Sequence, residues 1–169
     1  LSLAARASEL DYNIRLIKPS NAPTTNDHVW GFWSDPILAA AQQLARATWQ
    51  KWAIITHNDC AVLSSETRPY NAFKRSDWSE HCKGLAELSK VTIIAEHEWE
   101  KSADSLLFDT RPPVVPNDCM LQHFQGIEVK TKQPCFDKDM AILMDFRVDQ
   151  SKGMHFIYCL LYTSDAADE

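Results

Sequence analysis

Several features that would classify this chain at once are absent from its sequence. It holds four glycines in 169 residues, and they form no G-x-G-x-x-G turn or other glycine-rich phosphate loop. It has no run of about 18 apolar residues, so we expect no transmembrane helix. Seventeen basic residues against 23 acidic ones give a net charge of −6, which predicts no nucleic-acid partner. The first residues, Leu1-Ser2-Leu3, lack the basic segment of a signal peptide.

The cysteines and histidines show no metal-binding or disulfide pattern. The five cysteines are an odd number and include no C-x-x-C pair, which argues against a disulfide framework and against a zinc site. The six histidines are scattered, with no pair spaced i, i+4. We therefore expect no metal site, and the cysteine usage is typical of a protein in a reducing cytoplasm.

What is present is an apolar fraction of 45%, which suits one globular domain with a core. Periodicity and β-propensity predict helices and strands in an alternating order, followed by a run of strands. The expected helices are residues 1–10, 35–47 and 76–89, and the expected strands are 14–17, two within 49–63, 91–95, 106–109, 121–130, 141–148 and 154–158. This order predicts an α/β nucleotide-binding domain with an antiparallel sheet inserted or appended.

Both ends of the sequence suggest a fragment. The chain begins within a predicted helix that has no capping residue before it, as if a first strand and turn were missing. The last eleven residues, 159–169, resemble a translated sequencing adapter, although an ordinary acidic terminus is the alternative.

Two carboxylates interrupt apolar, strand-like segments. Glu128 alternates with Phe124 and Gly126, and an acid facing an apolar pocket has a raised pKa and can donate a proton. Asp145 lies within an apolar strand, where a buried carboxylate needs a partner or a function. The alternative for both is an acid at a sheet edge that reaches solvent. The alternating Glu96, Glu98 and Glu100 are expected on a solvated strand face.

Four segments, taken in order, resemble motifs of the bacterial lycopene β-cyclases. Residues 28–33 (His-Val-Trp-Gly-Phe-Trp) resemble H-T-W-x-F-W/H, and 109–111 (Asp-Thr-Arg) resemble a D-x-R segment. Residues 124–128 resemble F-x-G-x-E. Residues 143–158 resemble an M-D-x-x-V-x-Q strand followed by F-x-Y.

The resemblance implies an incomplete Rossmann-type FAD/NAD(P)-binding domain with an antiparallel β-sheet substrate region. Residues 1–113 would form the partial nucleotide-binding domain, lacking its first strand and glycine-rich turn. Residues 114–158 would belong to the substrate domain, and 159–169 would be the adapter-derived tail.

The resemblance also implies a reaction. Glu128 aligns with the family's proposed catalytic acid, and Asp145 is a second catalytic candidate. Acid-catalysed, non-redox cyclisation would convert the ψ-ends of lycopene into β-ionone rings. His28, Trp30, Phe32 and Trp33 are candidate substrate-binding residues, with plain core packing as the alternative.

A nucleotide with a non-redox role, NAD(P)H or reduced FAD, is the cofactor that the resemblance implies. Lys18 stands where an acid normally binds the ribose, and Asp109 and Arg111 are further candidate cofactor contacts. Lycopene dissolves in bilayers, so peripheral membrane contact is expected. The alternatives are a flavin-dependent oxidoreductase of the same superfamily, or a chain that is inactive as written.

Overall fold

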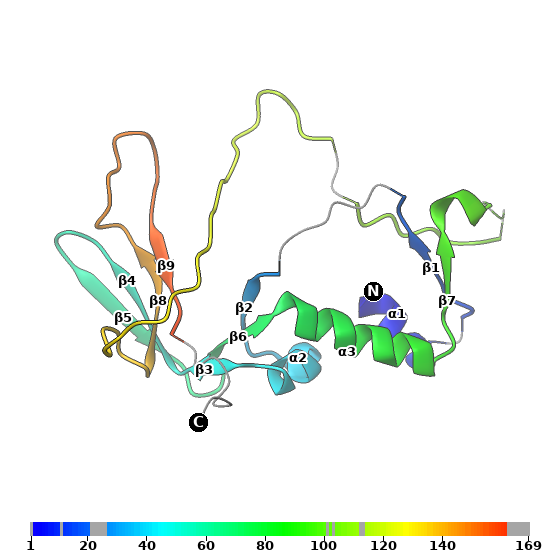
Figure 1. The fold of residues 1–169 in the computed structure, drawn as a ribbon, viewed down its shortest axis with the longest axis horizontal. Helices are drawn as coiled ribbons and strands as arrows, with labels where there is room; N and C mark the ends of the chain where they lie inside the picture. The colour runs from blue at the N-terminus through cyan, green and yellow to red at the C-terminus, as the bar shows by residue number, and fades with distance from the viewer. Residues whose placement is uncertain are drawn as a thin grey trace. The chain divides into compact units, whose positions relative to one another are not determined.

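The computed structural model describes residues 2–10, 12–20, 27–100, 102, 104–111 and 114–161 (Figure 1). The chain divides into two compact units that interleave along the sequence. The first unit comprises Leu1–Thr25 and Leu85–Val129, and the second comprises Asn26–Gly84 and Lys130–Glu169. The mixed α/β class predicted from the sequence is confirmed. The Rossmann-type architecture and the boundary between residues 113 and 114 remain predictions.

The first unit contains a pair of parallel strands. Strand β1 (Arg15–Lys18) pairs with β7 (Thr92–Ala95), with Arg15 opposite Thr92 and Lys18 opposite Ala95. Two short helices, α1 (Ser2–Ala5) and η1 (Ala7–Glu9), precede β1, and η3 (Glu96–Glu98) follows β7. Both strands were predicted, whereas the helix predicted over residues 1–10 is broken at Arg6, whose backbone leaves the helical conformation.

The second unit holds two sheets. In the three-stranded sheet, β6 (Tyr70–Lys74) lies between β2 (Val29–Trp33) and β3 (Ala47–Trp49) and is antiparallel to both. The four-stranded sheet has the order β5-β4-β8-β9, and only its central pair, β4 and β8, is parallel. Its strands are β4 (Lys51–Ile55), β5 (Cys60–Ser64), β8 (Met140–Asp145) and β9 (Ile157–Cys159).

The core of the second unit is built from both sheets. Trp49 and Tyr70 of the three-stranded sheet form one buried cluster with Ala141 and Leu143 of β8. Leu160, just after β9, packs against this cluster. Strand β6 is the most buried strand, yet the sequence analysis did not predict it. Its five residues include Asn71 and Lys74, which obscure the alternation that identifies a half-buried strand.

A carboxylate caps the first helical segment of the second unit. The Asp35 carboxylate accepts a hydrogen bond from the backbone N–H of Ile37 at 3.1 Å, ahead of η2 (Pro36–Leu38) and α2 (Ala39–Gln43). The predicted helix over 35–47 ends earlier because residue 47 joins β3. Helix α3 (Arg75–Leu88) matches the prediction, and the division between the units falls within it.

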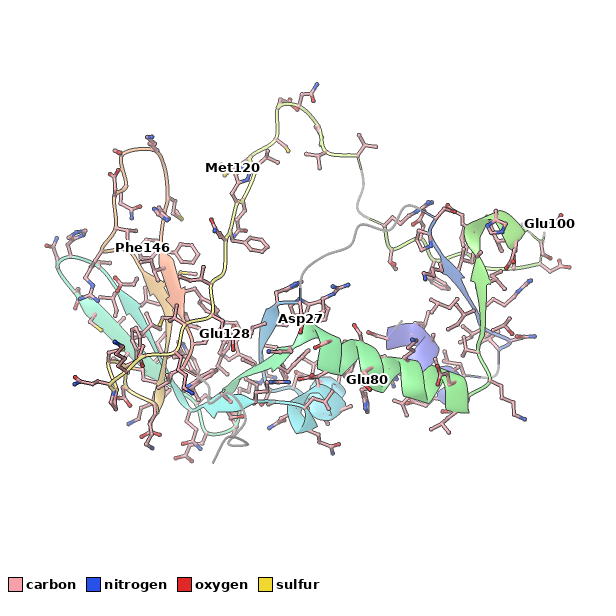
Figure 2. All side chains as sticks on the ribbon, viewed as in Figure 1. Asp27, Glu80, Glu100, Met120, Glu128 and Phe146 are labelled. Atoms are coloured by element: carbon pink, nitrogen blue, oxygen red, sulfur yellow. The ribbon has the colours of Figure 1, made fainter. Side chains whose placement is uncertain are left out.

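Two predicted strands are wrong. Residues 106–109 and 121–130 form neither helix nor strand, and their apolar side chains are exposed, including Leu106 at 83% and Phe124 at 88%. Figure 2 shows Met120 and Glu128 on residues 114–129, which form no helix or strand and which we call the extended segment. The β-propensity of a segment produces a strand only when a neighbouring backbone supplies its hydrogen bonds. The expected strand face of glutamates is also wrong, because Glu96 and Glu98 lie in the short helix η3.

The side chain of Gln150 holds the connection between β8 and β9 together. Its amide nitrogen Nε2 lies within hydrogen-bond distance of three carbonyl oxygens, those of Phe146 (3.1 Å), Val148 (3.1 Å) and His155 (2.6 Å). Its oxygen Oε1 accepts from the backbone N–H of His155 at 3.0 Å. Gly153 follows in the turn with φ of +126°, a conformation that favours glycine.

We expect Gln150→Glu to lower the stability of the protein by about 1 kcal/mol, because a carboxylate cannot donate to these carbonyl groups and water replaces only part of the lost hydrogen bonding at this exposed position. The matched control is Gln133→Glu, the same change at an exposed loop position. Denaturant unfolding of both variants measures the effect. Equal unfolding midpoints for the two variants would contradict the role of Gln150.

Candidate functional site

Three of the predicted substrate-binding residues lie on β2, with His28 directly before it, and the strand divides them between two faces. Trp30 and Phe32 share one face with Phe73 of β6, with ring centroids 5.9 Å and 5.3 Å from the Phe73 ring. His28 joins this group, since the Trp30 indole N–H donates to His28 Nε2 at 2.7 Å. Trp33 lies on the opposite face because side chains alternate along a strand.

Trp33 belongs to a second aromatic group, which we call the aromatic wall. It consists of Trp33, Trp52, Tyr70 and Tyr158. The Trp33 ring meets Tyr70 edge to face at 4.9 Å and Trp52 at 6.0 Å, and the ring of Tyr70 lies 6.4 Å from that of Tyr158. The structure therefore does not gather the four predicted residues into one cluster. No sequence motif indicated Tyr70 or Trp52, and only the F-x-Y segment indicated Tyr158.

Asp145, at the end of β8, has a charged partner. Arg147 donates to its carboxylate from Nε at 2.9 Å and from Nη2 at 2.7 Å, and the backbone N–H of Arg147 adds a contact at 3.1 Å. These hydrogen bonds, the side-chain ones first, lower the pKa of Asp145 to about 2. Asp145 is therefore ionised at neutral pH, which suits electrostatic stabilisation of a cation and does not suit proton donation.

Glu128 lies in the extended segment of the first unit and is exposed (Figure 2). The strand that was predicted to turn its side chain toward an apolar pocket is absent there. Its alignment with the catalytic acid of the family stays a prediction.

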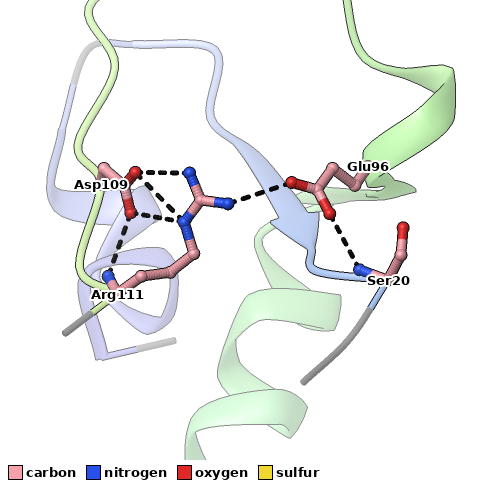
Figure 3. A network of polar contacts seen from close by, with 4 residues as sticks. All are labelled: Ser20, Glu96, Asp109 and Arg111. Atoms are coloured by element: carbon pink, nitrogen blue, oxygen red, sulfur yellow. Dashed lines mark hydrogen bonds and ion pairs between the residues drawn. The ribbon is translucent and has the colours of Figure 1, made fainter. Parts of the chain in front are cut away.

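The predicted cofactor contacts Asp109 and Arg111 do meet, and they form a polar network with two residues that the sequence analysis missed (Figure 3). Arg111 donates to Asp109 through Nε at 3.0 Å and Nη2 at 2.6 Å, and to Glu96 through Nη1 at 3.1 Å. The second oxygen of Glu96 accepts from the backbone N–H of Ser20 at 3.0 Å.

This network lies at the carboxyl ends of the parallel strands. Glu96 follows β7 directly, and Ser20 comes two residues after Lys18, the exposed last residue of β1. In open α/β sheets, ligands bind outside the carboxyl ends of the strands. The position of Glu96 directly after the strand predicted over 91–95 was the signal that could have identified it.

The positive charge of Arg111 compensates part of the negative charge of the two carboxylates in the network. Hydrogen bonds from the Arg111 guanidinium and backbone lower the pKa of Asp109 to about 2, and the Ser20 backbone N–H contributes most to a lowered pKa of Glu96. Both carboxylates are ionised at neutral pH, and Arg111 is shared between them. Carboxylate oxygens accept hydrogen bonds from ribose hydroxyls, and the ammonium of Lys18 suits a phosphate. The carboxylate acceptors of this network therefore suit the hydroxyl groups of a ribose.

Within the residues that the structure describes, no helix is long and apolar enough to cross a bilayer.

A family model described as lycopene cyclase protein matches residues 1–167, and so includes most of the tail that resembles an adapter. Residues 162–169 of that tail lie outside the described residues, and its adapter origin stays a prediction. A comparison with curated proteins finds no match.

Proposed function

The chain belongs to the lycopene cyclase family, and from this membership we propose that it takes part in forming β-ionone rings from the ψ-ends of lycopene. The observation that carries the proposal is the family match, which spans the aromatic strand β2, the segment with Glu128 and the strands β8 and β9. The reaction is an isomerisation in carotenoid biosynthesis and involves no net oxidation or reduction.

Glu128 is the proposed proton donor. Its carboxyl proton adds to C2 of the terminal double bond, which leaves a carbocation that the neighbouring double bond attacks to close the ring. Loss of the proton on C6 then restores a double bond and completes the β-ring. A carboxyl group suits this step when the bound polyene excludes water from it, because desolvation favours the neutral acid.

The other candidate residues stabilise positive charge. Trp33 is 47% exposed, and an accessible aromatic ring attracts a cation over its face. Asp145 stays ionised because Arg147 lowers its pKa, so its proposed role is that of a fixed negative charge. His28, Trp30 and Phe32 form a separate aromatic surface that is proposed to contact the polyene chain.

Lys18, Asp109 and Arg111, with Glu96, are proposed to hold the nucleotide, NAD(P)H or reduced FAD. When bound, the nucleotide supplies electrostatic stabilisation without net turnover. The carboxylates of Asp109 and Glu96 would accept the ribose hydroxyls, and Lys18 would contact a phosphate. The geometry of Figure 3 supports this assignment through the donors and acceptors that it gathers at one sheet edge.

Peripheral contact with a membrane is proposed from the nature of the substrate, and its cytoplasmic side from the cysteine usage. Lycopene partitions into the bilayer, so the protein must reach it at the membrane surface. The exposed apolar side chains of the extended segment support this proposal, among them Val114 (95%), Met120 (99%) and Phe124 (88%).

Expression of the complete reading frame in a bacterium that accumulates lycopene tests the proposed function. We expect the extracted pigment to shift from red lycopene to products with β-rings, measured by chromatography and absorption spectra. Unchanged lycopene, with the protein present at normal levels, would overturn the cyclase proposal and favour redox chemistry on another apolar substrate.

A further inference from the structure

The hydroxyl groups of the two tyrosines in the aromatic wall contact each other. The Oη atoms of Tyr70, on β6, and Tyr158, on β9, form a hydrogen bond that joins the two sheets of the second unit. Tyr70 is only 6% exposed, and its register partner on β2 is Trp33. The hydroxyl pair therefore fixes the ring against which Trp33 packs at a steep angle of 68°.

The pair depends on a glycine in the aromatic strand. A Cβ atom added at Gly31 would overlap Tyr70 Oη and would lie 2.6 Å from Tyr70 Cζ and 2.7 Å from Tyr158 Oη. Contacts this short are not tolerated by rigid aromatic rings. Gly31 thus leaves the space over β2 in which the two hydroxyls meet, two residues before Trp33.

The chemistry of the wall suits a carbocation. Burial raises the pKa of both phenols, so neither forms a phenolate that would capture the cation. The rings provide π-faces, and Trp33 remains accessible at 47% exposure while Tyr70 is enclosed. If the wall were ordinary core packing, phenylalanine would serve at the buried position 70 without a polar group to satisfy.

We propose that Tyr70 and Tyr158, seated over Gly31, are positioning residues that set the Trp33 ring against the carbocation of the cyclisation. This inference rests on the proposed function and adds residues to it. After ring closure, the positive charge lies on a carbon atom whose neighbouring carbon atoms each carry hydrogen, so more than one proton could leave. The position of the aromatic ring decides where the positive charge is best stabilised. The wall then influences which proton leaves.

The test compares Tyr70→Phe and Tyr158→Phe with Tyr12→Phe, the same change at a tyrosine of the first unit that is 76% exposed. Each variant is expressed in the complete reading frame in lycopene-accumulating bacteria, and the purified proteins are assayed on lycopene in phosphatidylcholine vesicles. We expect kcat to fall about tenfold in both wall variants with little change in KM, and a fraction of rings with a displaced double bond to appear. Trp33→Leu should lose about thirtyfold, and Trp33→Phe should restore part of that loss.

The outcomes separate the positioning role of the tyrosines from the proposed cyclase function. A changed ratio of ring isomers per amount of folded protein supports the positioning role, because a merely structural defect lowers yield without altering the products. Wall variants that match Tyr12→Phe in rate and products would overturn the inference alone, and so would lower yield with an unchanged product ratio. Absence of ring formation by the unsubstituted protein would overturn the proposed function, and the inference with it.

Discussion

Glu128→Gln is expected to abolish ring formation while leaving the amount of folded protein unchanged. Glutamine matches glutamate in size but has no acidic proton, and general acid catalysis contributes about 10²–10⁴ in rate. Glu128 is exposed in the structure, and glutamine keeps its size and a carbonyl oxygen, so we expect the fold to tolerate the change. The pigment of lycopene-accumulating cells should therefore stay red, as in cells without the gene.

The matched control is Glu100→Gln, the same change at an exposed position of the first unit (Figure 2). This control should leave cyclisation at the level of the unsubstituted protein. Full activity of Glu128→Gln would assign the proton to another acid. Asp145 is a poor replacement, because hydrogen bonds from Arg147 hold its pKa at about 2.

Asn71→Asp is expected to cause the largest loss of stability of any single substitution considered. Asn71 is fully buried in β6, the central strand of its sheet, and its amide donates to Ser34 Oγ at 2.8 Å and to the Pro69 carbonyl at 3.0 Å. Its oxygen accepts from Thr48 Oγ1 at 2.8 Å. A carboxylate of the same shape cannot donate and would face the Pro69 carbonyl oxygen. Burying an unpaired charge in this way costs about 3–5 kcal/mol at neutral pH.

The loss should depend on pH. Burial raises the pKa of the introduced aspartate in the folded state above its unfolded value of about 3.9. The protonated acid can donate to the Pro69 carbonyl, so the deficit is smallest below the unfolded pKa and grows as pH rises through the folded pKa. Unfolding midpoints at pH 4 and pH 7.5 measure this trend, with Asn58→Asp in an exposed turn as the control. A deficit that is small at both pH values would contradict the role assigned to Asn71.

The local structure of the second unit was predictable where short-range chemistry governs it. Asp35 and Pro36 marked a helix start because a carboxylate caps backbone N–H groups and proline fits the first turn. The strands within 49–63 and the helix over 76–89 followed from periodicity. By contrast, residues 106–109 and 121–130 had strand-like composition but have no strand partner in the described structure, and composition alone cannot reveal a missing partner.

Only some residues of the candidate site were predictable from the sequence, and their grouping was not. Asp109 and Arg111 were indicated by the resemblance of residues 109–111 to the D-x-R segment of the family. Glu96 is 15 residues from Arg111 in sequence, so only the fold could bring the two together. Similarly, the aromatic segment 28–33 was evident, but its division between two faces follows from its being a strand.

The sequence by itself determined the family, through motif order from residue 28 to residue 158, and the family match confirms it. It also determined the mixed α/β class and the kinds of side chain available for chemistry. Only the tertiary structure decided that Asp145 is paired with Arg147, that Glu96 completes the polar network, and that Tyr70 and Tyr158 meet over Gly31. The physical reason is that side-chain identity sets what a residue can do, whereas pKa values, ring contacts and steric room depend on neighbours from other strands. Tyr70 and Tyr158, 88 residues apart, illustrate a contact that no local pattern encodes.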